Sequence, residues 1–224
     1  MNPPDGNTTI PQPLVSAVLL AAGAGSRMGH RPKCLLELDG TPLIRRLIGA
    51  LLDAGVHELV VVLGHHAERI APVIGALPVT VVRNPDPQAS QNTSLHIGLR
   101  ALSQQPDTVL VALADQPLIR TQDISDLIGA YNQRPTHTQV VQPQVNGLPG
   151  NPVVFSAAVR EQILSGDTDA GCRQWQAAHP EAVCRWATTN QHYRTDMDTL
   201  DDIEALAAGT GHRLCWPADL AVKS

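Results

Sequence analysis

A glycine-rich, basic loop follows the first apolar run of the sequence, at residues 20–29. It contains three glycines, Gly23, Gly25 and Gly29. Because glycine has no Cβ, the backbone N–H groups of such a loop can approach an anion closely. Arg27 in the loop and Lys33 just beyond it add positive charge, the arginine as a two-pronged donor and the lysine as a compact point charge. This combination predicts a cradle for a triphosphate.

Spacing separates this cradle from two other nucleotide-binding loops. A dinucleotide fingerprint needs G-x-G-x-x-G, whereas three residues stand between Gly25 and Gly29. A Walker loop ends in Gly-Lys-Ser or Gly-Lys-Thr, whereas this loop continues from Gly29 into His30 and Arg31. A purely structural glycine turn, in which Arg27 and Lys33 would be solvated charges, stays open as an alternative.

Strand-like and helix-like segments alternate along the chain. This order predicts an α/β fold, with a Rossmann-like, mostly parallel sheet and helices on both faces. We expect strands at residues 15–20, 59–63, 79–82, 109–113, 139–145, 153–155 and 182–187. We expect helices at residues 42–54, 68–74, 94–102, 123–131, 157–164, 171–178 and 200–208.

The length of 224 residues fits a single α/β domain. We expect this domain at residues 14–208, with a flexible N-terminal tail at 1–13 and a C-terminal tail at 209–224. The N-terminal segment has no early basic region and no apolar stretch, unlike a signal peptide.

Composition excludes several classes of partner and site. The net charge is −5 and the basic residues are scattered, so we expect no nucleic acid. The four cysteines lie far apart without a Cys-x-x-Cys pair, which indicates neither a disulfide framework nor a zinc knuckle. The apolar runs are too short to cross a bilayer, so we expect a cytoplasmic protein without a membrane partner.

A carboxylate follows the fourth expected strand. Asp115 comes just beyond the apolar run at 109–113, so it should lie at the carboxyl end of that strand. The loop at 20–29 leaves the same end of the first strand, so both should face one crevice. Mg²⁺ prefers one or two carboxylates together with phosphate oxygens and water. Asp115 is therefore a candidate Mg²⁺ ligand, and a turn or helix-capping role is the alternative.

Several motifs together carry a resemblance to a known family. They are the loop at 20–29 with Pro32-Lys33, the stretch 35–43, Asn84-Pro85-Asp86, Ser94-Leu95 with Gly98-Leu99, the stretches 113–119 and 150–155, Gly166-Asp167, and Asp196-Met197-Asp198-Thr199. On these residues the chain resembles nucleotidyltransferases with a GT-A-like fold. Within the MobA-like family it is most similar to the molybdenum cofactor cytidylyltransferases, because of the Ala-Asp-Gln-Pro-Leu motif that contains Asp115.

This resemblance implies an enzyme that transfers CMP from CTP to the terminal phosphate of the molybdopterin cofactor and releases pyrophosphate. It implies catalytic roles for Arg27, Lys33 and Asp115, and it implies Asp115 and Asp198 as ligands of Mg²⁺. Capping of the following helix is the alternative role for Asp198. The implied nucleotide-binding residues are Leu20, Ala21, Ala22, Gly23, Gly25, Ser26, Arg27, Lys33 and Ser94. No general base is required, because a phosphate monoester is already ionised near neutral pH.

Two segments bear on the choice of base. Ala21-Ala22 is similar to the cytidylyl branch of the family, since the guanylyl branch carries an extra glycine there, and this favours CTP. The resemblance also places the base near residues 91–94. There Asn92, Thr93 and Ser94 either bind the base or cap a helix that begins near Ser94.

The acceptor half departs from the family. The resemblance implies Gln116, Asn151 and Pro152 as acceptor-binding residues, but Asn151 stands where a histidine is usual and cannot carry a charge. The expected partners are CTP, a phosphorylated pterin acceptor and a molybdoenzyme that receives the product. A sugar- or alcohol-phosphate acceptor and a non-catalytic cofactor-binding chaperone stay open. The presence of both Lys33 and Asp115 favours catalysis.

Two further features favour structural roles. His65 and His66 are adjacent and point in different directions, so a solvated loop pair is expected rather than a metal site. Cys34 lies among leucines and is expected to be a small buried core residue rather than a reactive thiolate.

Overall fold

The structure, a computed structural model, describes residues 14–86, 90–103 and 106–221, so the predicted tail at 1–13 lies outside it. The strands of the main sheet are β1 (Val15–Ala21), β4 (Glu58–Leu63), β5 (Thr80–Arg83), β6 (Thr108–Leu113), β7 (Val140–Val145), β8 (Leu148–Pro149), β9 (Val153–Ser156) and β10 (Val183–Thr188). The helices are α1 (Leu43–Asp53), α2 (Ala67–Ile74), α3 (Gln91–Ala101), α4 (Thr121–Asn132), α5 (Ala157–Ser165), α6 (Cys172–Ala178) and α7 (Leu200–Thr210). Short elements complete the list: β2 (Glu37–Leu38), β3 (Thr41–Pro42), β11 (Leu214–Cys215), and the 3₁₀ turns η1 (Ser26–Met28), η2 (Lys33–Leu35), η3 (Pro180–Ala182) and η4 (Gln191–Arg194).

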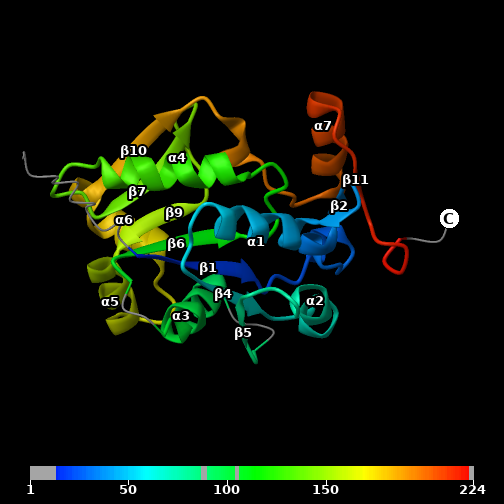
Figure 1. The fold of residues 1–224 in the computed structure, drawn as a ribbon, viewed down its shortest axis with the longest axis horizontal. Coiled ribbons are helices and arrows are strands. Elements are labelled where there is room, and N and C mark those ends of the chain that lie inside the picture. Colours follow the sequence, from blue (N-terminus) through cyan, green and yellow to red (C-terminus); the bar gives the residue numbers. More distant parts are fainter. Residues whose placement is uncertain (1–13, 87–89, 104–105, 222–224) are drawn as a thin grey trace, which may run out of the picture.

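The main sheet is mostly parallel and carries helices on both faces, which confirms the predicted α/β class (Figure 1). Its strand order is β10-β7-β9-β6-β1-β4-β5, with β8 paired to β7. Strand β9 runs antiparallel to both of its neighbours, β6 and β7, and β8 is antiparallel to β7. All seven strands expected from the sequence are present, within one or two residues of the predicted bounds.

Alternate residues of β1 supply two separate cores. Ala17 and Leu19 pack on one face with residues of α1, α2 and α4, whereas Val18 and Leu20 pack on the other with residues of α3 and α5. In Figure 1, α1 and α4 accordingly lie above the sheet and α3 and α5 below it. Burial on both faces explains why β1 is a continuous apolar run instead of an alternating one.

The register of β1 brings two loops to one edge of the sheet. Leu20 of β1 pairs with Leu113 of β6, and Ala21 pairs with Leu63 of β4. The glycine-rich loop and Asp115 therefore leave neighbouring strands at their carboxyl ends, where open α/β sheets place their ligands.

Helix α3 begins three residues before the predicted start, and this overturns one expectation. Its N-cap is Ser90, whose side-chain oxygen accepts a hydrogen bond from the backbone N–H of Thr93. The prediction that Asn92, Thr93 or Ser94 caps the helix was wrong, because these residues lie inside its first turns. Ser94 is instead buried, and its hydroxyl accepts a hydrogen bond from the Asn84 side chain at 2.9 Å.

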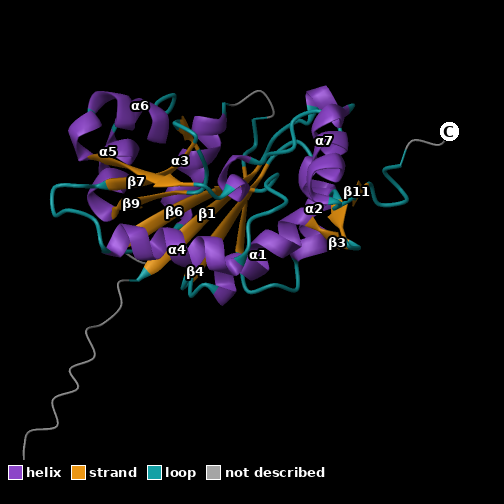
Figure 2. Ribbon diagram, turned by 90° about the horizontal axis from the view of Figure 1, so that it is seen from above, coloured by secondary structure: helices purple, strands orange, loops and turns teal. Residues whose placement is uncertain are grey.

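The segment after α7 is not simply a tail. Strand β11 pairs with β2, which pairs in turn with β3, and these strands gather with α7 at one end of the molecule (Figure 2). A third buried cluster fills this region, with Met28, Leu38, Met197, Leu206 and Leu214 among its members. The side chains of Met28 and Met197 in this cluster hold the loops that carry them against the rest of the domain. No helix in the described parts of the chain is long and apolar enough to span a bilayer.

Gly98 sets the distance between α3 and the sheet, so we predict that Gly98→Ala destabilises the protein. A Cβ there would collide with Val18 and would lie 2.8 Å from Cγ2 of Val62. Overpacking of this kind costs about 1–3 kcal/mol of unfolding free energy, measurable by urea denaturation. Gly49→Ala in α1 is the matched control, because nothing lies within 4 Å of the place that a Cβ would take there and alanine favours a helix by about 0.5–1 kcal/mol. Equal effects of the two substitutions would contradict this explanation.

Candidate active site

The glycine-rich loop is held in a tight, non-extended conformation. Gly25 and Gly29 adopt left-handed backbone angles, with φ of 62° and 69°. The carbonyl oxygen of Gly25 accepts hydrogen bonds from the backbone N–H groups of Met28 and His30, at 2.9 and 3.0 Å. A Cβ at Gly25 would lie against the carbonyl oxygen of Arg31, so glycine is required there for steric as well as conformational reasons.

His66 supports the loop from the segment between β4 and α2. Its Nε2 lies 3.1 Å from the carbonyl oxygen of Ala24, whereas His65 is exposed. The expectation of a solvated pair was therefore wrong for His66. The hydrogen bond joins the loop after β1 to the loop after β4.

Lys33 lies at the centre of the site and joins two carboxylates. Its Nζ donates to Oδ2 of Asp115 and to Oδ1 of Asp198, each at 2.7 Å. Arg27 approaches the other oxygen of Asp198 at 3.2 Å. The side chains of Lys33 and Asp115 are only 17% and 19% exposed, so these charges interact more strongly than a surface pair. The structure thus brings the loop, the β6 end and the segment before α7 to one point.

The charges of this cluster shift one another's pKa values. Burial alone would lower the pKa of Lys33, but the attraction of Asp115 and hydrogen bonds to Asp115 and Asp198 raise it above its usual value. The pKa of Asp198 is lowered, mainly by the hydrogen bond from Lys33. The pKa of nearby Asp196 is raised by burial and by repulsion from Asp115 and Asp198. Lys33 and Asp198 are therefore both charged across the neutral range.

We predict that Asp198→Asn makes the protein less sensitive to acid. Because the folded-state pKa of Asp198 lies below its ordinary 3.8, the folded chain binds fewer protons there than the unfolded chain. Its contribution to stability is present above the unfolded pKa and is lost as pH falls through the folded one. Melting temperatures measured from about pH 5 down to about pH 3 should fall less steeply in the variant than in the wild type. Parallel curves would contradict this.

A cleft of about 460 Å³ opens beside the cluster. Most of the expected nucleotide-binding residues line it, namely Leu20, Ala21, Ala22, Gly23, Arg27, Lys33 and Ser94. Gly25 and Ser26 are not among the residues that line it. Asp115 and Asp198 line the same cleft. We refer to it as the main cleft.

The two carboxylates fit a divalent cation. Asp115 and Asp198 converge on one cationic atom, and the second oxygen of Asp115 is buried without a hydrogen-bond partner among the described residues. Hard carboxylate oxygens are the donors that Mg²⁺ or Mn²⁺ prefers. Within the described residues no three metal-binding side chains gather. Two carboxylates match the Mg²⁺ pattern, in which substrate phosphates and water supply the other ligands.

Asp198 is not the cap of α7. That role belongs to Thr199, whose side chain accepts from the backbone N–H of Asp202, while Asp202 accepts in return from the backbone N–H of Thr199. The capping alternative for Asp198 was therefore wrong. Its side chain is left to contact Lys33 and Arg27.

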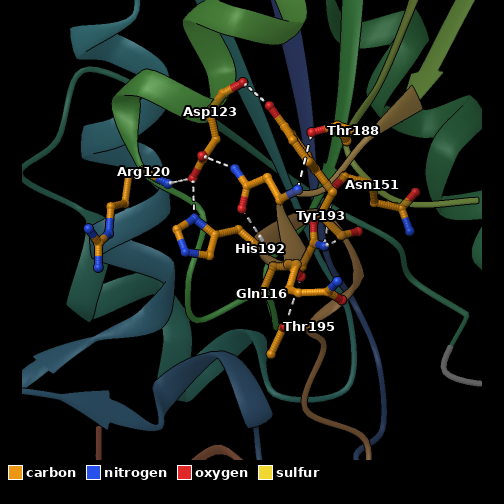
Figure 3. Close-up of polar contacts among 10 residues, drawn as sticks. Gln116, Arg120, Asp123, Asn151, Thr188, His192, Tyr193 and Thr195 are labelled. Carbon is orange, nitrogen blue, oxygen red and sulfur yellow. Dashed lines mark hydrogen bonds and ion pairs between the residues drawn. The ribbon is translucent and has the colours of Figure 1, made fainter. Parts of the chain in front are cut away.

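A hydrogen-bond network around Tyr193 joins the loops of the site (Figure 3). The backbone carbonyl of Tyr193 accepts from the Asn151 N–H at 2.8 Å and from Nε2 of Gln116 at 3.4 Å. The same Nε2 lies 3.2 Å from the carbonyl oxygen of Asn151. In addition, the carbonyl of Asp115 accepts from the backbone N–H of Met197 at 3.0 Å. The segments that carry Asp115, Asn151 and Asp198 are thus tied to one another.

Asp123 anchors this network to helix α4. Its buried carboxylate accepts from the Arg120 N–H, the Asn190 side chain and the His192 ring, at 2.8, 2.6 and 2.9 Å. The Tyr193 hydroxyl donates to the carbonyl oxygen of Asp123, and burial raises the pKa of Tyr193, so it stays a donor (Figure 3). The segment 190–193 is therefore fixed to α4.

The family follows from sequence comparison. Residues 17–183 match the MobA-like NTP transferase domain. This match covers well over half of the chain. The chain belongs to the MobA-like NTP transferase family. The resemblance inferred from the motifs is thereby confirmed at the level of the family.

Two curated proteins illustrate its relatives. Nicotine blue oxidoreductase of Paenarthrobacter nicotinovorans is 30% identical over 206 residues, which cover 90% of this chain and 99% of that protein. The bifunctional protein GlmU of Ralstonia nicotianae is 38% identical over 122 residues, 53% of this chain. This chain spans only 26% of the GlmU length.

Solved structures share the fold. A nucleotidyl transferase from Methanothermobacter thermautotroptrophicus is 25% identical, with a TM-score of 0.70 over 86% of this chain and 95% of that one. Rv0371c of Mycobacterium tuberculosis, solved as a complex with manganese, is 23% identical, with a TM-score of 0.69 over 88% of this chain and 100% of that one. These structures confirm the GT-A-like nucleotidyltransferase fold.

In this MobA-like NTP transferase, only one of the three acceptor residues implied by the sequence lines a cleft or cavity. Asn151 lines the main cleft and also a neighbouring cavity, which we call the side cavity. Gln116 is 2% exposed and Pro152 is buried, and neither lines these spaces. Gln116 acts behind the site, through its hydrogen bonds to Asn151 and Tyr193. Cys34 is buried in the core cluster that contains residues of β1 and α1, which confirms the expected core position, and burial raises the pKa of its thiol to about 12.

Sequence reasoning missed several residues of the site. Arg173 lines both the main cleft and the side cavity. Asp123 and His192 were not singled out either. None of these belongs to a recognisable motif, and each reaches the site through contacts between residues far apart in the chain. His96, for example, holds the segment before α6 by a 2.8 Å contact with the carbonyl oxygen of Ala170.

Proposed function

We propose that this MobA-like NTP transferase is a molybdenum cofactor cytidylyltransferase. It would transfer CMP from CTP to the terminal phosphate of a phosphorylated pterin, with Mg²⁺ as the cofactor, and a molybdoenzyme would receive the product. The observation that carries nucleotidyl transfer is the convergence of Lys33, Asp115 and Asp198 beside the glycine-rich loop. The pterin and the base rest on the resemblance described above.

The reaction needs positioning and charge neutralisation rather than a general base. The acceptor phosphate is already ionised, so one of its oxygens can attack the α-phosphorus directly, and the bond from that phosphorus to the β-phosphate oxygen breaks. In this scheme the loop N–H groups and Arg27 hold the β- and γ-phosphates. Lys33 stabilises negative charge that grows on the α-phosphate and on the departing pyrophosphate. A cation held by Asp115 and Asp198 would neutralise phosphate charge and fix the phosphates for in-line attack.

Lys33 must change partners for this scheme to work. In the structure its ammonium occupies the space between the two carboxylates. A divalent cation there would neutralise both carboxylates and free the ammonium to contact phosphate oxygens. Lys33 thus keeps the two acids together while no nucleotide is bound, because two unpaired carboxylates at this distance would repel each other.

We infer the preference for CTP from the resemblance, and the side chains of the cleft wall are compatible with it. Ala21 and Ala22 line the cleft beside Ser90, Gln91 and Ser94. Since neither the Ser94 hydroxyl nor the Gln91 amide donates a hydrogen bond to another residue in the described chain, these side chains can bind the polar edge of a pyrimidine. Asn151 has no side-chain partner among the described residues and can donate to an acceptor oxygen.

One specific observation supports testing a second function. The relative that is 30% identical along nearly its whole length is named as an oxidoreductase of nicotine blue. The name of this relative therefore refers to redox chemistry rather than to nucleotidyl transfer. For the present chain we keep nucleotidyl transfer as the proposal, because the cluster of Lys33, Asp115 and Asp198 suits phosphate chemistry.

The test measures pyrophosphate release from CTP, GTP, ATP and UTP with Mg²⁺, each with molybdopterin, with sugar phosphates or with no acceptor. The proposal expects release from CTP only when molybdopterin is present. Release with a sugar phosphate alone would replace the pterin with that acceptor. Nucleotide binding without release from any mixture would favour a non-catalytic chaperone. Loss of the nicotine blue colour in the presence of the protein and a reductant, without pyrophosphate release, would favour the oxidoreductase.

A further inference from the structure

The side cavity, of about 610 Å³, continues from the main cleft. The two spaces share one stretch of wall, which we call the junction, made by Leu20, Gln91, Leu113, Asn151, Arg173 and Asp196. The inner wall of the side cavity is apolar and is formed by residues of β1, β6 and α3, namely Leu20, Val111, Leu113 and Leu95. If the nucleotide occupies the main cleft, a molecule in the side cavity meets it at the junction.

The wall of the side cavity is rich in cationic and amide side chains. Of the described residues that line it, Arg173, Arg185 and Arg194 are cationic and Asp196 alone is acidic. Glutamine and asparagine side chains lie among them, at positions 91, 92, 142, 151, 174 and 176. This excess of hydrogen-bond donors favours an anionic ligand, although the net charge of the whole chain is −5.

The three arginines differ in what already binds them. Arg194 donates to the carbonyl oxygen of Pro149 at 2.9 Å, so its guanidinium is used to hold β8. Arg185 donates from NH1 to the side-chain oxygens of Gln142 and Gln176, the latter at 2.7 Å. Arg173 makes no hydrogen bond or ion pair with another residue in the described parts of the chain.

Arg185 is held in position with donors to spare. Gln176 is only 5% exposed, and Gln142 lies directly opposite Arg185 in the pairing of β7 with β10. Both amides contact the same nitrogen, which leaves the other guanidinium N–H groups available to a ligand. The two partners of Arg185 are neutral amides and no carboxylate among the described residues pairs with it, so its positive charge is available to an anionic ligand.

Arg173 is the cationic side chain that the described residues place at the junction. A transfer reaction must bring a nucleophilic phosphate next to a triphosphate, and the two anions repel. A guanidinium at the point of contact offsets this repulsion and binds two phosphate oxygens at once.

We propose that Arg173 binds the phosphate of the acceptor at the junction and that Arg185 binds a second anionic group at the far end of the acceptor. The inference rests on the proposed nucleotidyl transfer and names the acceptor class as a phosphomonoester with a second anionic group. Arg173 holds the dianion while one of its oxygens forms a bond to the α-phosphorus of the nucleotide. The bond from that phosphorus to the bridging oxygen breaks, pyrophosphate carries the electron pair away, and no proton is transferred.

The experiment uses two simple probes that differ in one group, phenyl phosphate and 4-carboxyphenyl phosphate. Calorimetric titrations are run with Mg²⁺ and a CTP analogue in which a methylene group bridges the α- and β-phosphorus, so that the main cleft is filled and no cleavage occurs. The wild type should bind both probes, the carboxylated one more tightly. Arg173→Ala should weaken both by about tenfold or more, because it removes hydrogen bonds to a charged group.

Arg185→Ala should weaken only the carboxylated probe, by about tenfold, and leave phenyl phosphate within about twofold. Arg173→Lys should be intermediate, because it keeps the charge and loses the two-pronged contact. Arg100→Ala, an exposed arginine of α3 outside both spaces, is the matched control and should change nothing. Thermal melting checks that each variant is folded.

Unchanged binding of phenyl phosphate to Arg173→Ala, or equal loss of both probes in Arg185→Ala, would overturn the inference. So would a wild type that binds neither probe. The proposed function fails separately, if the wild type releases no pyrophosphate from any nucleotide while the probe titrations behave as expected.

Discussion

Lys33→Ala is expected to lower kcat for pyrophosphate release by about 10²–10³-fold while the KM for the nucleotide changes much less. The reason lies in when Lys33 acts. In the proposed scheme its ammonium neutralises charge that develops on the α-phosphate and the leaving group, and an interaction that strengthens in the transition state appears mainly in kcat. The measurement is steady-state pyrophosphate release at several nucleotide concentrations, with the acceptor saturating.

The same substitution should strengthen metal binding, although it lowers turnover. Lys33 contributes one positive charge 2.7 Å from both Asp115 and Asp198. Without it the two carboxylates are uncompensated, so Mn²⁺ should bind the nucleotide-free variant more tightly than the wild type, as measured by electron paramagnetic resonance. Lys33→Arg should retain part of the turnover, and Arg213→Ala, an exposed arginine outside the main cleft, is the charge control. Unchanged kcat in Lys33→Ala would exclude Lys33 from the catalytic step.

Asp115→Asn is expected to lower turnover by about 10³-fold or more, because it removes a negative charge from the carboxylate pair that suits a divalent cation. The amide has nearly the same shape as the carboxylate, so the fold should be retained. Asp115 has one oxygen bonded to Lys33 and one buried oxygen without a partner among the described residues. The second oxygen is the one available to a cation.

Mn²⁺ affinity and pyrophosphate release should fall together in this variant, and raising the metal concentration should recover only part of the turnover. Asp126→Asn in α4 is the matched control, because Asp126 is exposed and accepts a hydrogen bond from Gln122 outside the main cleft. A variant that keeps wild-type turnover with an unchanged metal requirement would show that Asp115 is a turn residue, the alternative raised by its sequence position.

The features that local sequence determines were predictable. An apolar run buried on both faces, followed by glycines and basic residues, specified β1 and the loop after it, and the position of Asp115 followed from a later apolar run. The family motif then identified Asp198. These inferences needed only the order of strands and the rule that parallel strands share their carboxyl edge.

The features that depend on long-range packing were not predictable. Arg173 reaches the junction because the segment before α6 packs on α3, where Asn92 and His96 bond the carbonyl oxygens of Asp169 and Ala170. Nothing in the sequence around Arg173 indicates this contact. The start of α3 was placed too late because Ser90 and Ser94 are equally good capping residues by type. Only the backbone shows that Ser90 has the extended conformation of an N-cap.

The carbonyl oxygen of Tyr193 has a thermodynamic consequence for substrate binding. It accepts hydrogen bonds from Asn151, which lines both spaces, and from Gln116, the neighbour of Asp115. A molecule that shifts Asn151 should therefore also shift the segment that presents Asp115, the proposed metal ligand. Free energy exchanged in this way is reciprocal, so the acceptor should raise the affinity of the protein for the nucleotide by the same factor as the nucleotide raises it for the acceptor. The order in which the two substrates arrive would then leave the stability of the ternary complex unchanged.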